Sequence, residues 1–417
     1  IKGKYKNSIS DEYKRRLIMA KVLGINTSHE ASIAGMTDGK LDFYHEEARW
    51  VRDKHYIPHE DTVKESGMLS LDWAFEQTPV DDWDTIGIAS FDRRHTSYQL
   101  MYEETDENDD THQIYPVLEE DRWLFQDMRH FLIDEPITVE RTEQAQKDFQ
   151  WDGDTQVFQF SLEAGHDMPI NTAIADKYNI KEFDFVKEHH HLLHAFCGFY
   201  MSPFKDALVL VCDGGGARAF YEDYPSYGEI ESIYYLDEQT VEPLYKHLTN
   251  NRDINSTVMS STDQNFFMHE QVFDLSASDN KYGYDVRLSS LYSEGQKFSM
   301  LSQLCQLDSH GRAAGKLMGL ASYGLNYPWD EYSQTGVAGK LQRETVSHTK
   351  ELIQRALDYK PECKNIILSG GYALNCVGNY EYKKIFPNIN IFIDPASHDG
   401  GTAIGSCVKN TFYTGDE

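Results

Sequence analysis

The sequence predicts an α/β fold made of two similar halves, because the same order of strand, polar turn and hairpin occurs twice along its 417 residues. In the first half, residues 21–26 are apolar enough for a short buried strand. Residues 31–36 and 41–45 then surround the dipeptide Asp38-Gly39, which is typical of a tight hairpin turn. The chain therefore opens with a strand, a loop and a hairpin.

The second occurrence begins with the apolar run of residues 207–212, which leads into the Gly-rich turn 213–216. We expect residues 217–222 and 229–236 to form the second hairpin. A unit of this kind that occurs twice is the layout of a duplicated ribonuclease-H-like fold, in which a nucleotide lies between the two halves. The repeat is one of pattern and not of residue identity.

The rest of the pattern divides the chain into a tail, two halves and an insertion. Residues 1–18 are polar and rich in Lys and Arg, so we expect an N-terminal tail there. The first half is expected over residues 19–200, with an insertion at about 60–180 that includes a helix at 121–133. The second half is expected over residues 201–417.

The composition favours a folded protein that does not bind polyanions. Apolar residues make up 40% and aromatic residues 13% of the chain, which is enough for a sizeable core. The formal net charge of -29 repels nucleic acids and anionic membranes at long range. The six cysteines are scattered, and neither a signal peptide nor a long apolar run is recognised, so reduced and buried thiols in a cytoplasmic protein are the expectation.

The most informative motif is a histidine pair in the segment 189–196. His190 and His194 are four residues apart, so on a helix they share one face and can bind one metal ion. A solvated cluster of histidines is the alternative interpretation of this spacing alone. Apolar neighbours such as Leu193 and Phe196 favour a packed helix, whose inward-facing imidazoles need a partner.

Two aspartates are candidate partners for these imidazoles. Asp213 ends a buried strand directly before three glycines, and Asp399 precedes a helix of small residues. A buried carboxylate is costly unless it is paired or bound to a cation, although an aspartate that caps a turn or a helix is the alternative. Two histidines with one or two aspartates and open positions suit a catalytic divalent ion such as Fe²⁺.

Glycine-rich turns in the C-terminal part supply candidates for nucleotide binding. A helix is expected at 345–359 and strands at 365–368 and 388–393, and the first of these strands leads into a Gly-Gly turn. Adjacent glycines let backbone N–H groups approach a phosphate, and a lysine among small residues can reach one, although a surface lysine is the alternative. The candidate residues are Gly214, Gly215, Lys316, Gly370, Gly371 and Asn375.

Taken together, these motifs resemble the O-carbamoyltransferases, a family that carbamoylates antibiotics, nodulation factors and toxins. Seven matching segments follow one another in the order of the family, and together they are specific although no single one is. The segments are Gly24-Ile25-Asn26 with His29-Glu30-Ala31-Ser32, Glu46-Glu47 with Arg49, Arg52, Lys54 and His55, His190-His191 with His194-Ala195 and Ser202-Pro203-Phe204, Asp213-Gly214, 315–324, 370–375 and 399–405.

The resemblance implies an actin-like ATPase core, similar to the tRNA threonylcarbamoyl-transfer protein, with two halves around a cleft for nucleotide and metal. Carbamoyladenylate, made from ATP and carbamoyl phosphate, would lie across the cleft, and an acceptor hydroxyl would attack its carbamoyl carbon and release AMP. His29 would orient or deprotonate this hydroxyl, and Lys54 would stabilise a phosphate or carbamoyl oxygen. The metal ligands would be His190, His194, Asp213 and Asp399.

Two departures from the family accompany the resemblance. Glu30 stands where the family usually has Asp, and the YrdC-like domain that makes carbamoyladenylate is absent from this sequence, so we expect that domain in cis or in trans. The acceptor would be a small molecule, a glycan or a nucleotide, and the resemblance also implies a homodimer. The alternatives are a tRNA threonylcarbamoyl-transfer-like protein, which the net charge disfavours, a non-catalytic nucleotide-binding or interaction protein, and a sugar kinase or ATPase.

Overall fold

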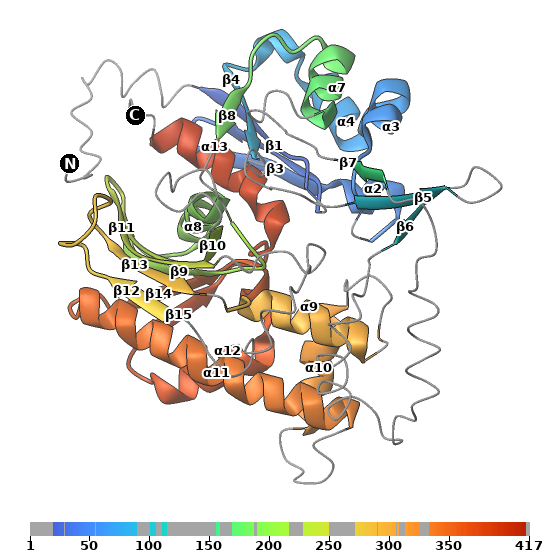
Figure 1. Cartoon of the computed structure of the whole chain (residues 1–417). Coiled ribbons are helices and arrows are strands. Elements are labelled where there is room, and N and C mark those ends of the chain that lie inside the picture. Colours follow the sequence, from blue (N-terminus) through green and yellow to red (C-terminus); the bar gives the residue numbers. More distant parts are fainter. Residues whose placement is uncertain are drawn as a thin grey trace.

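The structure is a computed structural model of the chain (Figure 1). It describes residues 20–28, 30–54, 56–89, 101–105, 111–114, 156–158, 169–186, 190–216, 228–249, 272–289, 291–305, 307, 313–324 and 333–413. The predicted tail at 1–18, the predicted helix at 121–133 and the candidate catalytic residue His29 lie outside these ranges.

The first half is built on a five-stranded sheet with the strand order β3-β2-β1-β4-β8. Strand β2 is antiparallel to β1 and to β3, whereas β4 is parallel to β1 and to β8. The strand expected at 21–26 and the hairpin around Asp38-Gly39 are thereby confirmed. The five strands are β1 (Lys21–Asn26), β2 (Ser32–Thr37), β3 (Lys40–Glu46), β4 (Thr85–Ala89) and β8 (Asp184–Val186).

The second half is built on a seven-stranded sheet with the order β12-β13-β11-β10-β9-β14-β15. Strand β10 is antiparallel to β9 and to β11, whereas β14 is parallel to β9 and to β15. The strands are β9 (Asp206–Cys212), β10 (Gly228–Asp237), β11 (Val241–Thr249), β12 (Val272–Leu275), β13 (Asp285–Ser289), β14 (Asn365–Ser369) and β15 (Asn390–Ile393).

Five consecutive strands of the second sheet, from β11 to the edge strand β15, repeat the first sheet strand for strand. The order β11-β10-β9-β14-β15 has the same directions as β3-β2-β1-β4-β8. Two copies of one mixed five-stranded unit are the duplicated ribonuclease-H-like architecture of the actin-like ATPases, so the predicted fold class is confirmed.

Two expectations about the elements are corrected. The partners of β10 are β9 and β11, so the predicted pairing of 229–236 with 217–222 is wrong, and 217–222 lies outside the described residues. Strand β11 was not predicted from the sequence, because Pro243 and the charged Lys246 interrupt its apolar residues. The range 60–180, expected as an insertion, contributes β4 to the first sheet.

Two helices lie between the sheets, as Figure 1 shows: α8 (His190–Met201) and α13 (Thr402–Phe412). Their side chains share one core with both halves, to which Val22 of β1 and Val209 of β9 belong. Small residues let the backbones approach closely, because a Cβ on Gly405 would lie only 2.1 Å from the carbonyl oxygen of Leu193. Helix α13 therefore joins the second half to the first.

Further helices cover the outer faces of the two sheets (Figure 1). The second sheet packs against α9 (Glu294–Leu304), α10 (Ala314–Gly324), α11 (Gln334–Tyr359) and α12 (Cys376–Ile385). The first packs against α3 (Glu60–Ser66), α4 (Leu69–Gln77) and α7 (Pro169–Tyr178). The helix predicted at 345–359 is confirmed as the C-terminal part of α11.

A small third sheet of the order β6-β5-β7 comprises β5 (Met101–Thr105), β6 (Thr111–Ile114) and β7 (Gln156–Phe158).

Across the described ranges, no helix combines the length and hydropathy that a membrane span requires. Five of the six free cysteines are buried as expected, but Cys376, at the start of α12, is exposed.

Candidate metal and nucleotide site

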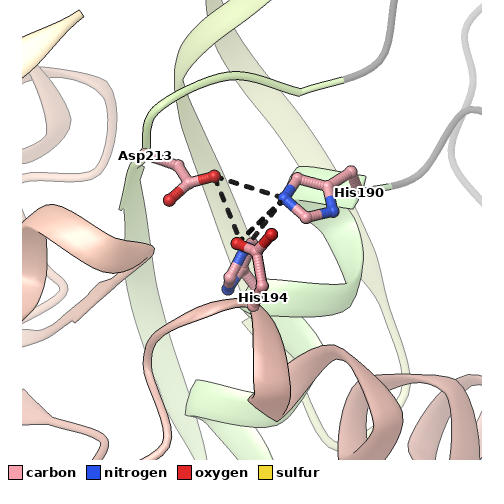
Figure 2. Close-up of side chains that lie close together, drawn as sticks. His190, His194 and Asp213 are labelled. Atoms are coloured by element: carbon pink, nitrogen blue, oxygen red, sulfur yellow. Dashed lines mark hydrogen bonds and ion pairs between the residues drawn. The ribbon is translucent and has the colours of Figure 1, made fainter. Parts of the chain in front are cut away.

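Helix α8 begins at His190 and places two imidazoles on one face. His190 and His194 lie on successive turns, and their Nε2 atoms point toward each other across 3.1 Å (Figure 2). Both rings are buried, with 6% of His190 and none of His194 exposed. Their positions follow from the i, i+4 spacing, and the apolar Leu193 and Phe196 hold this helix in the core as the sequence predicts.

Asp213 faces this pair from the end of β9. Its Oδ2 atom lies 3.2 Å from Nε2 of His190 and 3.9 Å from Nε2 of His194 (Figure 2). Its Oδ1 atom accepts a hydrogen bond from the backbone N–H of Gly371, at 2.8 Å. Because β9 and β14 are parallel, the turns that follow them meet at one edge of the sheet, which explains this contact.

The turn after β14 requires a glycine at position 370. Gly370 has a φ of 86°, and a Cβ there would lie 2.3 Å from the carbonyl oxygen of Cys212. No other residue type satisfies both the left-handed backbone and the close approach. The Gly-Gly sequence thereby brings the second turn against Asp213 and fixes the direction of its carboxylate.

Asp399 completes the cluster from the first turn of η6 (Asp399–Gly401), directly before α13. Its Oδ1 atom lies 3.6 Å from Nε2 of His190 and 3.6 Å from Nε2 of His194. The side chain of Asn26, at the end of β1, donates to the carbonyl oxygen of Asp399 at 3.1 Å. Both halves of the molecule therefore position this carboxylate.

The four side chains have the chemistry and spacing of a metal site. Each offers one ligand atom, and these atoms all lie within 4.8 Å of one another. Ligands of an ion at about 2.0–2.2 Å are separated by roughly 2.8–3.6 Å at right or tetrahedral angles. The observed separations of 3.1–3.9 Å are close to that range, so an ion fits between the side chains with little movement.

The charges at the site also favour a cation. Burial alone would lower the pKa of His190, but Asp399 and Asp213 outweigh it and raise that pKa. Burial and Asp399 tend to raise the pKa of Asp213, whereas His190 and His194 lower it, and the net pKa is lowered. Two buried carboxylates thus hold positive charge on an imidazole, and a divalent ion would take the place of that proton.

His191, the third histidine in the run, belongs to different surroundings. Its Nδ1 atom lies 2.7 Å from the hydroxyl of Ser232 on β10, and its ring is fully buried. Burial lowers the pKa of His191, so that its imidazole is neutral. It therefore supports the packing of α8 on the second sheet and is a natural control for the two neighbours.

The predicted nucleotide-binding residues divide into two groups. Gly214 and Gly215 are half-buried in the turn after β9, and a Cβ on Gly214 would meet no described residue within 4 Å. The side of Gly214 on which a Cβ would stand is thus free of described atoms. Gly371 lies next to the four-residue cluster and donates its N–H to Asp213.

The other two predicted residues have structural partners. Asn375 accepts from the N–H of Gly378 at the start of α12 and donates to Gln342 at 2.9 Å, so both ends of its amide are used. Lys316 is exposed on α10, and its Nζ atom donates to the carbonyl oxygen of Leu307. No contact in the described ranges joins either side chain to the four-residue cluster.

The two predicted catalytic residues are placed only in part. His29 lies outside the described residues, but its neighbour Ser28 has its hydroxyl 3.4 Å from Oδ2 of Asp399. Lys54 is exposed after α2 (Glu47–Val51), and within the described residues it makes no hydrogen bond or ion pair with the cluster. The roles of His29 and Lys54 stay predictions.

Sequence reasoning missed a network next to Asp399. Nδ1 of His398 lies 2.7 Å from a carboxylate oxygen of Glu30, and its Nε2 lies 3.2 Å from one of Glu46. Burial tends to lower the pKa of His398, but the two carboxylates outweigh it and raise it to about 10. The charged run that begins at Glu46 is not solvated at its start, because Glu46 makes this ion pair and Glu47 is buried.

No protein-family model matches the sequence, and no curated protein matches it. Similar solved structures include HypF from T. kodakarensis, with 12% identity and a TM-score of 0.49 over 94% of this chain and 48% of that one. They also include full-length HypF in a phosphate- and nucleotide-bound form, with 14% identity and a TM-score of 0.37 over 58% of this chain and 45% of that one. A third is the activator of the 2-hydroxyisocaproyl-CoA dehydratase from Clostridium difficile with bound ADPNP, with 8% identity and a TM-score of 0.41 over 94% of each chain.

The chain therefore spans less than half the length of both HypF chains. The fold itself rests on the two matching strand orders described above.

Proposed function

We propose that this chain is the acyl-transfer domain of an O-carbamoyltransferase, which moves a carbamoyl group from carbamoyladenylate to a hydroxyl group of an acceptor. The observation that carries this proposal is the convergence of two imidazoles and two carboxylates where the two halves meet. The ordered motif resemblance supports the same activity. An open glycine turn lies beside the cluster, where a nucleotide phosphate would sit.

The carbamoyl donor needs little activation by the protein, because an acyl phosphate is already activated. The acceptor oxygen forms a bond to the carbamoyl carbon, the bond from that carbon to the phosphate oxygen breaks, and AMP leaves. When bound, a divalent ion would supply charge neutralisation at the phosphate and the carbonyl. The protein supplies position: His190, His194, Asp213 and Asp399 hold one fixed point, and the turn at Gly214 offers backbone N–H groups beside it.

The acceptor proton needs a base near the same point. Ser28, the residue before His29 in the sequence, has its hydroxyl 3.4 Å from Oδ2 of Asp399. We assign the removal of the hydroxyl proton to His29, since an imidazole near its ordinary pKa suits that step at neutral pH. The donor set of two histidines and two aspartates favours Fe²⁺ as the ion.

The same architecture serves phosphoryl transfer in other proteins, so ATP hydrolysis or sugar phosphorylation is the second candidate. The two candidates differ in what they consume. A carbamoyltransferase domain uses carbamoyladenylate and releases AMP, whereas a kinase or ATPase converts ATP to ADP without any carbamoyl donor. The net charge of -29 disfavours tRNA as the acceptor.

The direct test gives synthetic carbamoyladenylate to the anaerobically purified protein together with a panel of sugar, glycan and nucleoside acceptors. AMP release is measured by chromatography and the carbamoylated product by mass spectrometry. We expect His194→Ala to lower transfer at least about 100-fold, which corresponds to a loss of ~3 kcal/mol of transition-state stabilisation. His191→Gln, on the same helix but outside the cluster, keeps the activity. ADP formation from ATP alone, with no product from carbamoyladenylate, would contradict the proposal.

A further inference from the structure

A second group of potential metal ligands lies on the opposite face of the second sheet. Its members are Glu231 on β10, His247 on β11 and His348 on α11, and their ligand atoms lie within 4.8 Å of one another. Ser232, the next residue after Glu231, contacts His191 on α8. Because neighbouring residues of a strand point to opposite faces, the second group is separated from the first by the sheet.

The three side chains of this group contact one another directly. Nε2 of His348 lies 2.5 Å from Oε1 of Glu231, and Nδ1 of His247 lies 3.0 Å from Oε2 of the same carboxylate. Three donors from three separate elements therefore converge. Glu231 and His247 are buried, whereas 28% of the His348 side chain is exposed, which leaves a path from solvent.

The orientation of the His247 ring is held by a second partner. Its Nε2 atom lies 2.7 Å from the hydroxyl of Ser289 on β13. A metal-binding histidine commonly engages its other ring nitrogen in this way, which fixes the direction of the nitrogen that binds the ion. Two imidazoles and one carboxylate, with further positions open to water, form a donor set that zinc and other divalent transition metals accept.

A buried carboxylate lies on α9, which packs in the same core as α11 on this face of the sheet. Glu294, at the start of α9, is 4% exposed, and one of its oxygens accepts from Lys297 at 3.0 Å. Its other oxygen is buried, and no group in the described part of the chain donates to it. A buried carboxylate oxygen without a donor is costly, and a nearby cation offsets that cost.

We propose that Glu231, His247 and His348 bind a second divalent transition-metal ion, for which Zn²⁺ is the fitting probe. The ion would join β10, β11 and α11 at one point. Glu231 pairs with Cys212, the residue before Asp213, and Gly295 packs against the Asp213–Gly214 turn. The second ion would thus brace the turn that carries Asp213 from behind, as a structural site.

The experiment counts Zn²⁺ ions on the whole chain after metal removal and reloading, by elemental analysis following gel filtration. The variant His190→Ala/His194→Ala removes the first site, and His348→Gln, at a half-exposed position, removes a ligand of the second. We expect the first variant to keep one ion per chain and the triple variant to lose it. We also expect Zn²⁺ to raise the unfolding temperature of the first variant but not of the triple variant.

Circular dichroism and thermal unfolding without metal establish that each variant is folded. A hydrogen-bonded network that needs no ion predicts that His190→Ala/His194→Ala binds no Zn²⁺, and this result would overturn the second site. Retention of the ion in the triple variant would overturn it as well. Neither readout depends on carbamoyl transfer, so failure of the proposed function leaves the second site testable.

Discussion

At the scale of single residues, Glu47 illustrates how a charged run is not uniformly solvated. The sequence places it among Glu46, Arg49 and Arg52, yet only 2% of Glu47 is exposed. Its carboxylate accepts from the backbone N–H groups of Leu69 at 2.7 Å and Ser70 at 2.9 Å, which are among the first of α4. An anion at this position satisfies donors that the helix itself leaves unpaired.

We therefore predict that Glu47→Ala lowers the free energy of unfolding by about 1–3 kcal/mol, because two backbone N–H groups lose a charged acceptor. The measurement is urea denaturation followed by circular dichroism. Glu65→Ala, at an exposed position of α3, serves as the control and should change stability by less than about 0.5 kcal/mol. Equal effects of the two substitutions would refute the capping role.

At the scale of elements, the sequence predicted the strands that consist of apolar runs and missed those that depend on partners. The runs at 21–26, 207–212 and 365–368 became β1, β9 and β14. Strand β11 escaped prediction because Lys246 and His247 are buried only through partners on other elements, namely Glu229 and Glu231. Such pairing is tertiary information that periodicity does not carry.

The first turns of α11 were missed for a different reason: glycines at 336 and 339 weaken the helical pattern. The structure explains Gly339, because α10 ends against it. A Cβ on Gly339 would lie 2.6 Å from the carbonyl carbon of Gly324. The glycine lowers helix propensity but permits the close crossing of the two helices.

We predict that Gly339→Ala destabilises the protein, since overpacking costs about 1–3 kcal/mol and the gain in helix propensity is at most about 1 kcal/mol. Gly319→Ala is the matched control on α10, because a Cβ there meets no described residue within 4 Å. This second substitution should be neutral or stabilising. Thermal unfolding of both variants checks the difference, and a stabilised Gly339→Ala would show that the crossing tolerates a larger residue.

At the scale of the whole molecule, the duplication of the fold determines where the candidate site lies. The two mixed sheets face each other across α8 and α13, so the ends of β1, β9 and β14 approach the same junction. Local motifs in the sequence were sufficient to select His190, His194, Asp213 and Asp399, which the fold then brings together. Their role as metal ligands stays a prediction.

Two further groups of side chains could not be predicted from sequence patterns. The network of Glu30, Glu46 and His398 joins the N-terminal hairpin to a segment far away along the chain. The group of Glu231, His247 and His348 likewise depends on a β-hairpin and a helix about 100 residues later. No spacing rule within one segment detects such clusters, because only the fold makes them neighbours.

The measurement that tests the central claim most directly is the metal content of anaerobically purified protein, prepared without chelators, with and without His190→Ala/His194→Ala. Inductively coupled plasma mass spectrometry should find that the double variant loses about one ion per chain, with iron as the metal lost. His191→Gln should retain that ion. Equal metal content in the parent protein and the double variant would contradict the four-residue metal site and, with it, the proposed transferase.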